Sequence, residues 1–218
     1  VMNFKTIKTF NPRTGNFLDQ NYIVSTLNDL NEKVSDAQLA FTVYRNISGN
    51  DRAILLETIA EEIESVAEEI LAIATLETGL QAGRIQSETV RTIGQLRLFA
   101  EVARKEFWLD AVIDTALPNR QPLPKADIRK CLVPIGPVAV FGASNFPLAF
   151  STAGGDTVSA LASGNPVIVK AHNSHLGTHE CMAAAIARAL ERCNLPKGIF
   201  SSLIAEGNEL GAALVQHP

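Results

Sequence analysis

The chain has 218 residues, of which 46% are hydrophobic and 19% are charged, a mixture typical of a folded globular protein rather than a disordered one. Its 23 acidic and 19 basic residues give a net charge of −4, which argues against a protein that binds the phosphates of nucleic acids. The sequence has no run of about 18 apolar residues that would predict a membrane span. Its three cysteines form no Cys-x-x-Cys pair, which favours a reducing compartment such as the cytoplasm.

The first half of the chain predicts helices after a short region of extended pieces and a turn. One helix is expected over residues 27–45. The next has apolar residues at spacings of three and four; Asn50 or Asp51 can cap its start and Gly79 can end it. A third is expected over residues 88–108. The side chains expected to face the core from this third helix are Val90, Ile93, Leu96, Phe99, Val102 and Phe107.

The second half of the chain alternates strands and helices. Prolines mark residues 117–125 as a connector or sheet edge, and a strand is expected over 127–133. Three buried strands follow, over residues 137–142, 166–170 and 199–204. Helices are expected to start at Pro147 and to cover residues 176–192 and 209–216. This order predicts an α/β fold whose parallel sheet is covered by helices on both faces.

Ligands of such sheets bind at the carboxyl ends of the strands, so the loops at residues 143–146 and 171–175 should build any site. Asn145 could donate a hydrogen bond to a developing oxyanion, or it could only cap the helix expected after it or satisfy the turn. Lys170 could contact a ribose or a phosphate, or it could be an ordinary surface lysine. Both pairs of interpretations remain open from position alone.

Other polar and small residues near the strand ends also allow two interpretations. Gly207 and Gly211 could permit close approach of an adenosine or could simply form a turn. His172 could cap a helix or face a ribose. His175 and His179 can share a helix face, but they lack the acidic residue of a His-Glu-x-x-His motif, so we predict no metal site. We expect the cysteines to be buried, inert thiols; they are Cys131, Cys181 and Cys193.

Several segments resemble the aldehyde dehydrogenase superfamily. They are PIGPVAVFGASNFP at residues 134–147, LASGNPVIVK at 161–170 and LETG at 76–79. More narrowly, FSTAGGDT at 150–157 and KAH at 170–172 resemble the α-ketoglutaric semialdehyde (2,5-dioxovalerate) dehydrogenase branch, which is close to NADP-dependent fatty aldehyde dehydrogenases. The resemblance extends over essentially the whole chain.

The resemblance implies an organisation of the chain. Residues 1–114 would be the N-terminal helical part of the cofactor domain, and residues 115–133 the start of an oligomerisation β-arm. Residues 134–218 would form the first strands of a parallel, Rossmann-like cofactor sheet. The catalytic domain would lie outside this chain, and the enzyme would be a homo-oligomer, either a dimer or a tetramer.

The resemblance also implies roles for individual residues. Asn145 would be the oxyanion-hole amide, and Lys170 would contact the adenosine ribose or its 2′-phosphate. Ser144 and Phe146 would line the nicotinamide side through their backbone. Gly207 and Gly211 would lie near the adenine, with His172 and Asn173 also at the cofactor.

Cofactor choice is where the chain departs from many relatives. Members of the family that prefer NAD commonly carry a glutamate where this sequence has Asn173. A carboxylate would repel a 2′-phosphate and an amide would not, so NADP is the expected cofactor and NAD remains an alternative.

The resemblance implies that the whole enzyme oxidises an aldehyde to a carboxylic acid, converting α-ketoglutaric semialdehyde to 2-oxoglutarate. The nucleophilic cysteine, the general-base glutamate and the Gly-Ser cofactor motif of that family have no counterpart here. We therefore expect these 218 residues to be a truncated portion that is inactive alone. Two alternatives stay open: a non-catalytic fragment that binds a dinucleotide or partner subunits, and an NADP-dependent fatty aldehyde dehydrogenase.

Overall fold

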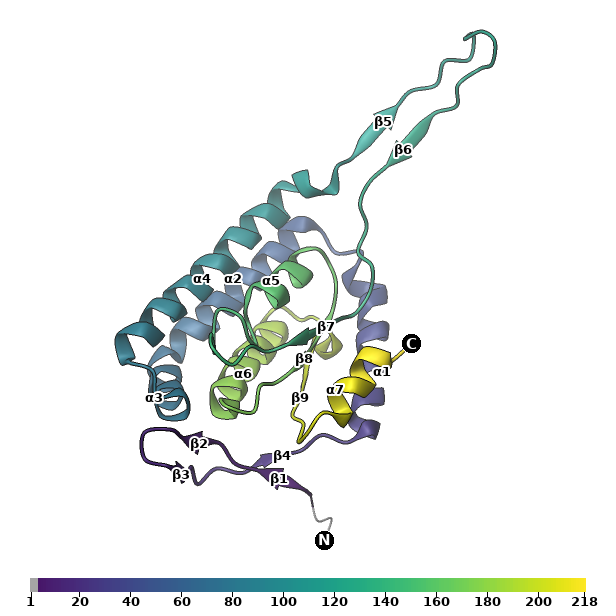
Figure 1. Ribbon diagram of the computed structural model, residues 1–218. Coiled ribbons are helices and arrows are strands. Elements are labelled where there is room, and N and C mark those ends of the chain that lie inside the picture. Colours follow the sequence, from purple (N-terminus) through teal and green to yellow (C-terminus); the bar gives the residue numbers. More distant parts are fainter. Residues whose placement is uncertain (1–3) are drawn as a thin grey trace.

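The computed structural model describes residues 4–218 (Figure 1). Its helices are α1 (Leu27–Tyr44), α2 (Gly49–Ser65), α3 (Ala67–Thr78), α4 (Ala82–Lys105), α5 (Gly155–Ala162), α6 (Leu176–Arg192) and α7 (Glu209–Gln216), with 3-10 turns η1 (Phe107–Leu109) and η2 (Lys197–Ile199). Its strands are β1 (Thr6–Ile7), β2 (Phe10–Asn11), β3 (Asn16–Phe17), β4 (Tyr22–Ile23), β5 (Val112–Asp114), β6 (Ile128–Lys130), β7 (Val138–Phe141), β8 (Val167–Lys170) and β9 (Phe200–Leu203). Among the described residues, no helix combines the length and the apolar character needed to cross a bilayer.

The predicted parallel sheet is confirmed. Strands β7, β8 and β9 pair in that order, and both pairings are parallel. In the register, Val140 lies opposite Val169, which lies opposite Ser202. All three carboxyl ends therefore meet at one edge of the sheet, where Phe141, Lys170 and Leu203 are neighbours.

The sheet lies between two layers of helices, as the continuous apolar strands predict (Figure 1). Val167 and Val169 belong to the large buried cluster formed with α2, α4, α5 and α6. Ile168, which points to the opposite face, packs in a second cluster with Leu30 of α1 and Leu214 of α7. Burial on both faces fixes the register of β8, because a shift by one residue would exchange the two sets of side chains.

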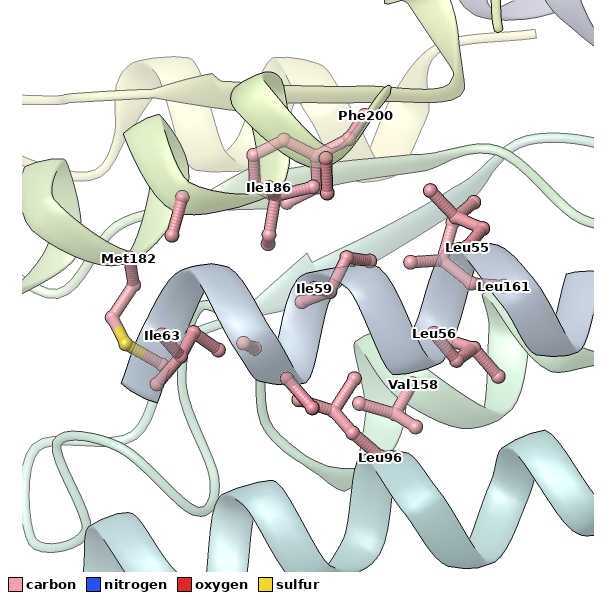
Figure 2. Close-up of a cluster of buried hydrophobic side chains, with 14 of the residues drawn as sticks. Leu55, Leu56, Ile59, Ile63, Leu96, Val158, Leu161, Met182, Ile186 and Phe200 are labelled. Atoms are coloured by element: carbon pink, nitrogen blue, oxygen red, sulfur yellow. The ribbon is translucent and has the colours of Figure 1, made fainter. Parts of the chain in front are cut away.

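Helix α2 is the centre of the larger cluster. Figure 2 shows its buried side chains reaching toward α4 on one side and toward α5 and α6 on others. The residues labelled there are Leu55, Leu56, Ile59, Ile63, Leu96, Val158, Leu161, Met182, Ile186 and Phe200. This packing joins the helical first half of the chain to the sheet of the second half.

The single helix expected from Asn50 or Asp51 to Gly79 is wrong, because the chain forms two helices there. Helix α2 ends at Ser65 and α3 starts at Ala67, with Val66 at φ −115° and ψ 17° between them. The apolar spacing continues across this break, and neither Gly nor Pro marks it, so the periodicity alone does not reveal it. The cap is also different: the Ser48 side chain accepts a hydrogen bond from the Asp51 N–H at 3.0 Å.

Helix α4 also starts earlier than expected, at Ala82 rather than at residue 88. Ile93 and Leu96 are buried as predicted, but Val90 and Phe107 are 70% and 86% exposed and Val102 is 38% exposed. The buried face of α4 includes two threonines, whose hydroxyl groups donate to main-chain carbonyls one turn earlier within the helix. Because these polar residues take buried positions, a pattern of apolar residues alone identifies only part of the buried face.

The helix expected to start at Pro147 begins at Gly155. Residues 147–154 instead form successive turns, in which the Gly154 N–H donates to the Ser151 carbonyl at 3.0 Å. A Cβ on Gly154 would lie 2.6 Å from the Ala149 carbonyl oxygen, so this close approach needs glycine. Asn145 consequently caps no helix, so the capping part of that alternative is wrong.

Residues after α4 form an extended antiparallel hairpin that projects away from the body of the protein (Figure 1). Val112 pairs with Lys130, so the hairpin already begins at residue 112, and the expected strand over 127–133 is present as the shorter β6.

Cys131, just after β6, is exposed, so the expectation of a buried thiol is wrong for this residue. Its hairpin projects from the body, so no helix covers it. Cys181 and Cys193 are partly buried.

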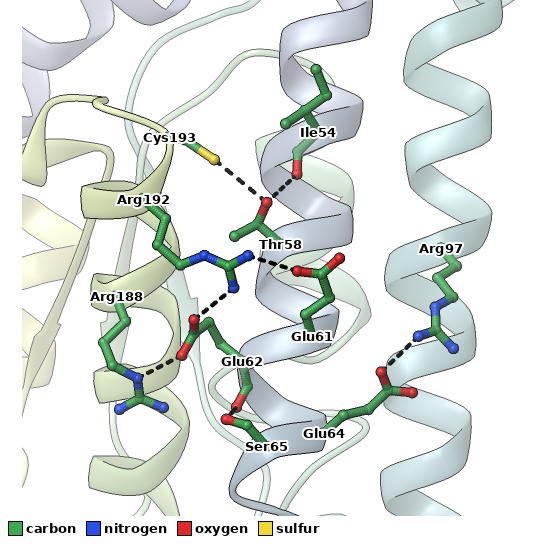
Figure 3. Close-up of polar contacts among 10 residues, drawn as sticks. All are labelled: Ile54, Thr58, Glu61, Glu62, Glu64, Ser65, Arg97, Arg188, Arg192 and Cys193. Carbon is green, nitrogen blue, oxygen red and sulfur yellow. Dashed lines mark hydrogen bonds and ion pairs between the residues drawn. The ribbon is translucent and has the colours of Figure 1, made fainter.

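Ion pairs join α2 to α6 on the outer surface (Figure 3). The Glu62 carboxylate contacts Arg188 Nε at 2.6 Å and Arg192 Nη1 at 2.7 Å. Hydrogen bonds from these two guanidinium groups lower the pKa of Glu62 below its ordinary value. The resulting stabilisation is present above the ordinary glutamate pKa and is lost as the pH falls through the lowered pKa of the folded state.

We expect Glu62→Gln to reduce the free energy of unfolding by about 1 kcal/mol at neutral pH. The difference from the unaltered protein should vanish in acid, where Glu62 is protonated in both states. Urea unfolding measures this from about pH 7 downward until the pH lies below the lowered pKa of Glu62. Glu68→Gln is the control, since Glu68 forms no ion pair within residues 4–218. A loss of equal size at every pH would contradict the prediction.

Candidate functional site

The carboxyl ends of the strands open onto a pocket of about 540 Å³. Its lining residues are Lys8, Phe10, Pro12, Glu77, Thr78, Leu80, Ser144, Asn145, Asn173 and Ser174. The pocket therefore brings together three predicted site residues, Ser144, Asn145 and Asn173, from the two loops that the topology indicated. Phe146, Lys170, His172 and both predicted glycines lie outside its lining.

An N-terminal hairpin, in which β2 pairs antiparallel with β3, forms a wall of this pocket that the sequence did not predict. Arg13, in the turn between β2 and β3, donates from Nη2 to the Gly79 and Leu80 carbonyls at 2.8 and 3.1 Å. These bonds tie the hairpin to the end of α3, where Gly79 has the left-handed φ of +67° that a helix C-terminus favours. Strands of two residues carry no periodicity, so the sequence held no signal that Lys8 and Phe10 would reach the site.

The loop that carries Asn145 is held at its base by Ala143. The Ala143 N–H donates to the Phe150 carbonyl at 3.0 Å, and its carbonyl contacts His175 Nε2 at 2.8 Å. Asn145 itself is exposed, and its side-chain amide forms no hydrogen bond within the described part of the chain. A fixed loop with an unengaged amide at its tip can donate to a ligand oxygen without first breaking an internal bond.

Phe146 turns away from the pocket. Its ring packs edge-to-face on Phe150, with 4.9 Å between the centroids. The Arg84 guanidinium lies 4.5 Å from the centre of the Phe146 ring. The aromatic pair thereby attaches the loop to α4.

Lys170 ends β8 and is partly buried. Burial lowers the pKa of its ammonium group, and no carboxylate pairs with it within residues 4–218. A partly desolvated cation without a protein counter-ion fits an anionic or hydroxyl-rich ligand at this edge of the sheet. The nearby His172 has a pKa lowered by burial and by the charges of His175 and Lys170, which favours its neutral ring.

Asn173 connects two loops at the carboxyl edge. Its side-chain Nδ2 donates to the Ala205 carbonyl, just beyond β9, at 2.8 Å. The residue is otherwise exposed beside Ser174 and lines the pocket. A glutamate at this position would lose the donor and would place a carboxylate against the Ala205 carbonyl.

The sequence pattern that defines the aldehyde dehydrogenase family matches residues 2–218. This chain belongs to the aldehyde dehydrogenase family. Among curated relatives, α-ketoglutaric semialdehyde dehydrogenase 2 of Azospirillum brasilense is 49% identical over 98% of this chain and 41% of its own length. The α-ketoglutaric semialdehyde dehydrogenase of Acinetobacter baylyi is 48% identical over 89% of this chain and 36% of its own length.

Solved structures show the same fold. HpcC from Thermus thermophilus superimposes with a TM-score of 0.80 at 27% identity, over 98% of this chain and 39% of that one. A betaine aldehyde dehydrogenase from Staphylococcus aureus gives a TM-score of 0.82 at 20% identity, over 98% and 41%. The chain thus spans about two fifths of the length of the relatives that it matches.

Of the two predicted glycines of this aldehyde dehydrogenase chain, Gly207 lies just before α7 and Gly211 lies within its first turn. Gly207 has a φ of +71°, which suits a turn between β9 and α7. A Cβ on Gly211 would meet the Phe141 ring at 3.5 Å, an ordinary contact. Gly207 therefore forms a turn, and Gly211 packs against Phe141 at the end of β7.

The histidines have structural contacts. His175, not His172, occupies the N-terminal cap position of α6, so the interpretation of His172 as the cap is wrong. The His172 ring instead accepts the Ser174 N–H through Nδ1 at 3.2 Å. His179 contacts the Thr152 hydroxyl at 2.7 Å, and burial lowers its pKa to about 3, so it stays neutral. No group of three potential ligands is placed to hold a metal ion among residues 4–218.

Proposed function

We propose that the enzyme containing this chain oxidises an aldehyde to a carboxylic acid with NAD(P), and that its substrate is α-ketoglutaric semialdehyde. The observation that carries the proposal is the identity of 49% and 48% to two α-ketoglutaric semialdehyde dehydrogenases over nearly all of this chain. Since the chain spans about two fifths of those proteins, the proposed activity is that of the whole enzyme.

Asn145 acts on the substrate in this proposal. Its amide donates a hydrogen bond to the aldehyde oxygen as negative charge develops there, and the anchored loop holds the donor in place. The pocket lining contains no cysteine among the described residues, so the nucleophile would come from elsewhere in the whole enzyme. Burial raises the pKa of Cys181 to about 12, which makes this thiol unreactive at neutral pH.

The residues at the sheet edge fit a nicotinamide dinucleotide. The unpaired, partly buried Lys170 ammonium suits the adenosine ribose or its 2′-phosphate, with His172 and Asn173 beside it. Ser144 and the Phe146 backbone would line the nicotinamide, and Gly207 and Gly211 would lie near the adenine. The bound cofactor supplies the hydride acceptor. The neutral side chain of Asn173, in place of a carboxylate, favours NADP.

The projecting hairpin supports a homo-oligomer as part of the proposal. Both of its strands are exposed along their whole length and carry apolar side chains, among them Ile113 and Ile128. Exposed apolar strands of this kind are typical of surfaces that pair with another chain.

The proposal places the enzyme in the cytoplasm. Three free cysteines are compatible with that reducing compartment.

The whole enzyme can be tested with α-ketoglutaric semialdehyde and with a long-chain aliphatic aldehyde, each with NADP and with NAD. We expect reduced cofactor and 2-oxoglutarate to form, with a much higher kcat/KM for the semialdehyde than for the long-chain aldehyde. A preference for the aliphatic aldehyde would reject the substrate, and no oxidation of any aldehyde would reject the activity.

Asn173→Glu should lower the ratio of kcat/KM for NADP to that for NAD by about tenfold, or about 1.4 kcal/mol. The introduced carboxylate repels the 2′-phosphate and can accept the ribose hydroxyls of NAD. Asn173→Gln is the matched control because it changes the side-chain length and the Ala205 contact without adding charge. Equal shifts for the two variants would show that charge at this position does not select the cofactor.

A further inference from the structure

A buried carboxylate on α4 binds the loop that carries Asn145. Glu88 is 3% exposed, and its Oε1 accepts hydrogen bonds from the Leu148 N–H at 2.9 Å and the Ala149 N–H at 3.0 Å. Its Oε2 faces Arg84 Nε at 3.5 Å and accepts no hydrogen bond within residues 4–218. One carboxylate oxygen therefore satisfies two consecutive buried N–H groups that lie 60 and 61 residues further along the chain.

With these contacts, the loop that carries Asn145 is held at both ends. Ala143 is held on the N-terminal side by Phe150 and His175, and Leu148 and Ala149 are held on the C-terminal side by Glu88. Asn145 lies between the two anchors. Residues 147–154 lie outside any helix or strand, so their backbone N–H groups lack the acceptors that regular structure provides. Glu88 on α4 supplies such an acceptor to two of them.

We infer that Glu88 is a positioning residue for catalysis, which holds the Asn145 amide where it meets the developing oxyanion. This inference rests on the proposed function. Glu88 is buried behind the loop and outside the pocket lining, so it acts through the backbone of Leu148 and Ala149. A displacement of about 1 Å in a donor of this kind can cost about 100-fold in rate, which makes the anchor a determinant of kcat.

Glu77, the other buried carboxylate at this edge, provides a matched comparison. Glu77 is 2% exposed, and its Oε1 accepts the Gly177 N–H at 2.6 Å. Its Oε2 accepts the N–H and the hydroxyl of Thr178 at 2.9 and 2.8 Å. Glu77 thus fixes the start of α6, directly after the loop that carries His172 and Asn173, and it also lines the pocket.

The two carboxylates should respond differently to the same substitution. At Glu88 a single oxygen accepts both loop bonds, so Glu88→Gln can keep that oxygen. Its NH₂ group then replaces Oε2, which faces only the Arg84 guanidinium at 3.5 Å, and that side chain is 43% exposed and has room to move away. At Glu77 both oxygens accept bonds, so Glu77→Gln sets an NH₂ group against a donor. Glutamine is therefore tolerated at residue 88 and disruptive at residue 77.

The test measures kcat and both KM values in the whole enzyme. Glu88→Met, which keeps side-chain length and removes both acceptors, should lower kcat by about 10- to 100-fold with the cofactor KM little changed. Glu88→Gln should restore kcat to within about threefold of the unaltered enzyme, and Glu77→Gln should mainly raise the cofactor KM. Equal losses for the two Glu88 variants, or an unchanged kcat in Glu88→Met, would overturn the inference.

A second readout does not depend on turnover. Amide hydrogen exchange at Leu148 and Ala149 should accelerate in Glu88→Met and remain slow in Glu88→Gln, since only the first loses the acceptor. If the unaltered enzyme oxidises no aldehyde, the proposed function fails, and unaccelerated exchange in Glu88→Met would overturn the anchor separately. If Glu88→Met does not fold, Glu88→Asp takes its place, because it withdraws the carboxylate by one methylene. We expect the same lowered kcat and the same faster amide exchange.

Discussion

We expect Asn145→Ala to lower kcat for aldehyde oxidation by about 10²- to 10³-fold, the usual cost of removing one oxyanion donor. The structure supports an effect of this size, because the amide is exposed at the tip of an anchored loop and has no internal bond to lose. The bond to the substrate oxygen strengthens as charge develops, so its removal should change kcat more than KM. Steady-state kinetics of the whole enzyme with a saturating cofactor concentration measures both constants.

Ser144→Ala is the matched control for this experiment. Ser144 is the neighbour of Asn145 in the same loop and lines the same pocket, but its proposed contact is through the backbone. We expect its kcat to stay within about threefold of the unaltered enzyme. A similar loss in both variants would indicate damage to the loop, and an unchanged kcat in Asn145→Ala would reject the oxyanion role.

The sequence predicts the second half of the fold better than the first. Strands β7, β8 and β9 and helices α6 and α7 lie where the alternation of buried strands and helices places them. The errors have local causes. The break at Val66 carries no Gly or Pro, and the buried face of α4 contains threonines that an apolar pattern overlooks. Residues 147–154 are held by turns and by Glu88, which no local pattern could indicate.

In the candidate site, too, the sequence predicts some residues and not others. Ser144, Asn145 and Asn173 meet at the pocket because parallel topology alone places the two loops side by side. The residues that hold these loops come from far along the chain. Glu77 binds Gly177 across 100 residues, and Arg13 binds Gly79 across 66. Contacts of such separation depend on the packing of the whole domain, so one sequence without its fold does not reveal them.

The packing that brings these distant residues together centres on Ile59, which is fully buried in α2 among Leu96 of α4 and Phe200 of β9 (Figure 2). We expect Ile59→Ala to reduce the free energy of unfolding by about 3–4 kcal/mol, from lost burial and from the cavity that remains. The cluster joins α4, which carries Glu88, to the sheet, and a rigid core around Ile59 can only partly collapse into the space. The midpoint of urea unfolding measures the change.

Ile54→Ala is the control for the same chemical change in the same helix. Ile54 is 44% exposed, so removal of its side chain leaves little cavity and should cost less than about 1 kcal/mol. Under conditions where Ile59→Ala remains folded, its kcat should stay close to that of the unaltered enzyme, because Glu88 and His175 still anchor the Asn145 loop. Equal shifts in the unfolding midpoint for Ile54→Ala and Ile59→Ala would show that α2 is not the centre of the core. A large loss of kcat in folded Ile59→Ala would show that the core, rather than the two local anchors, sets the position of Asn145.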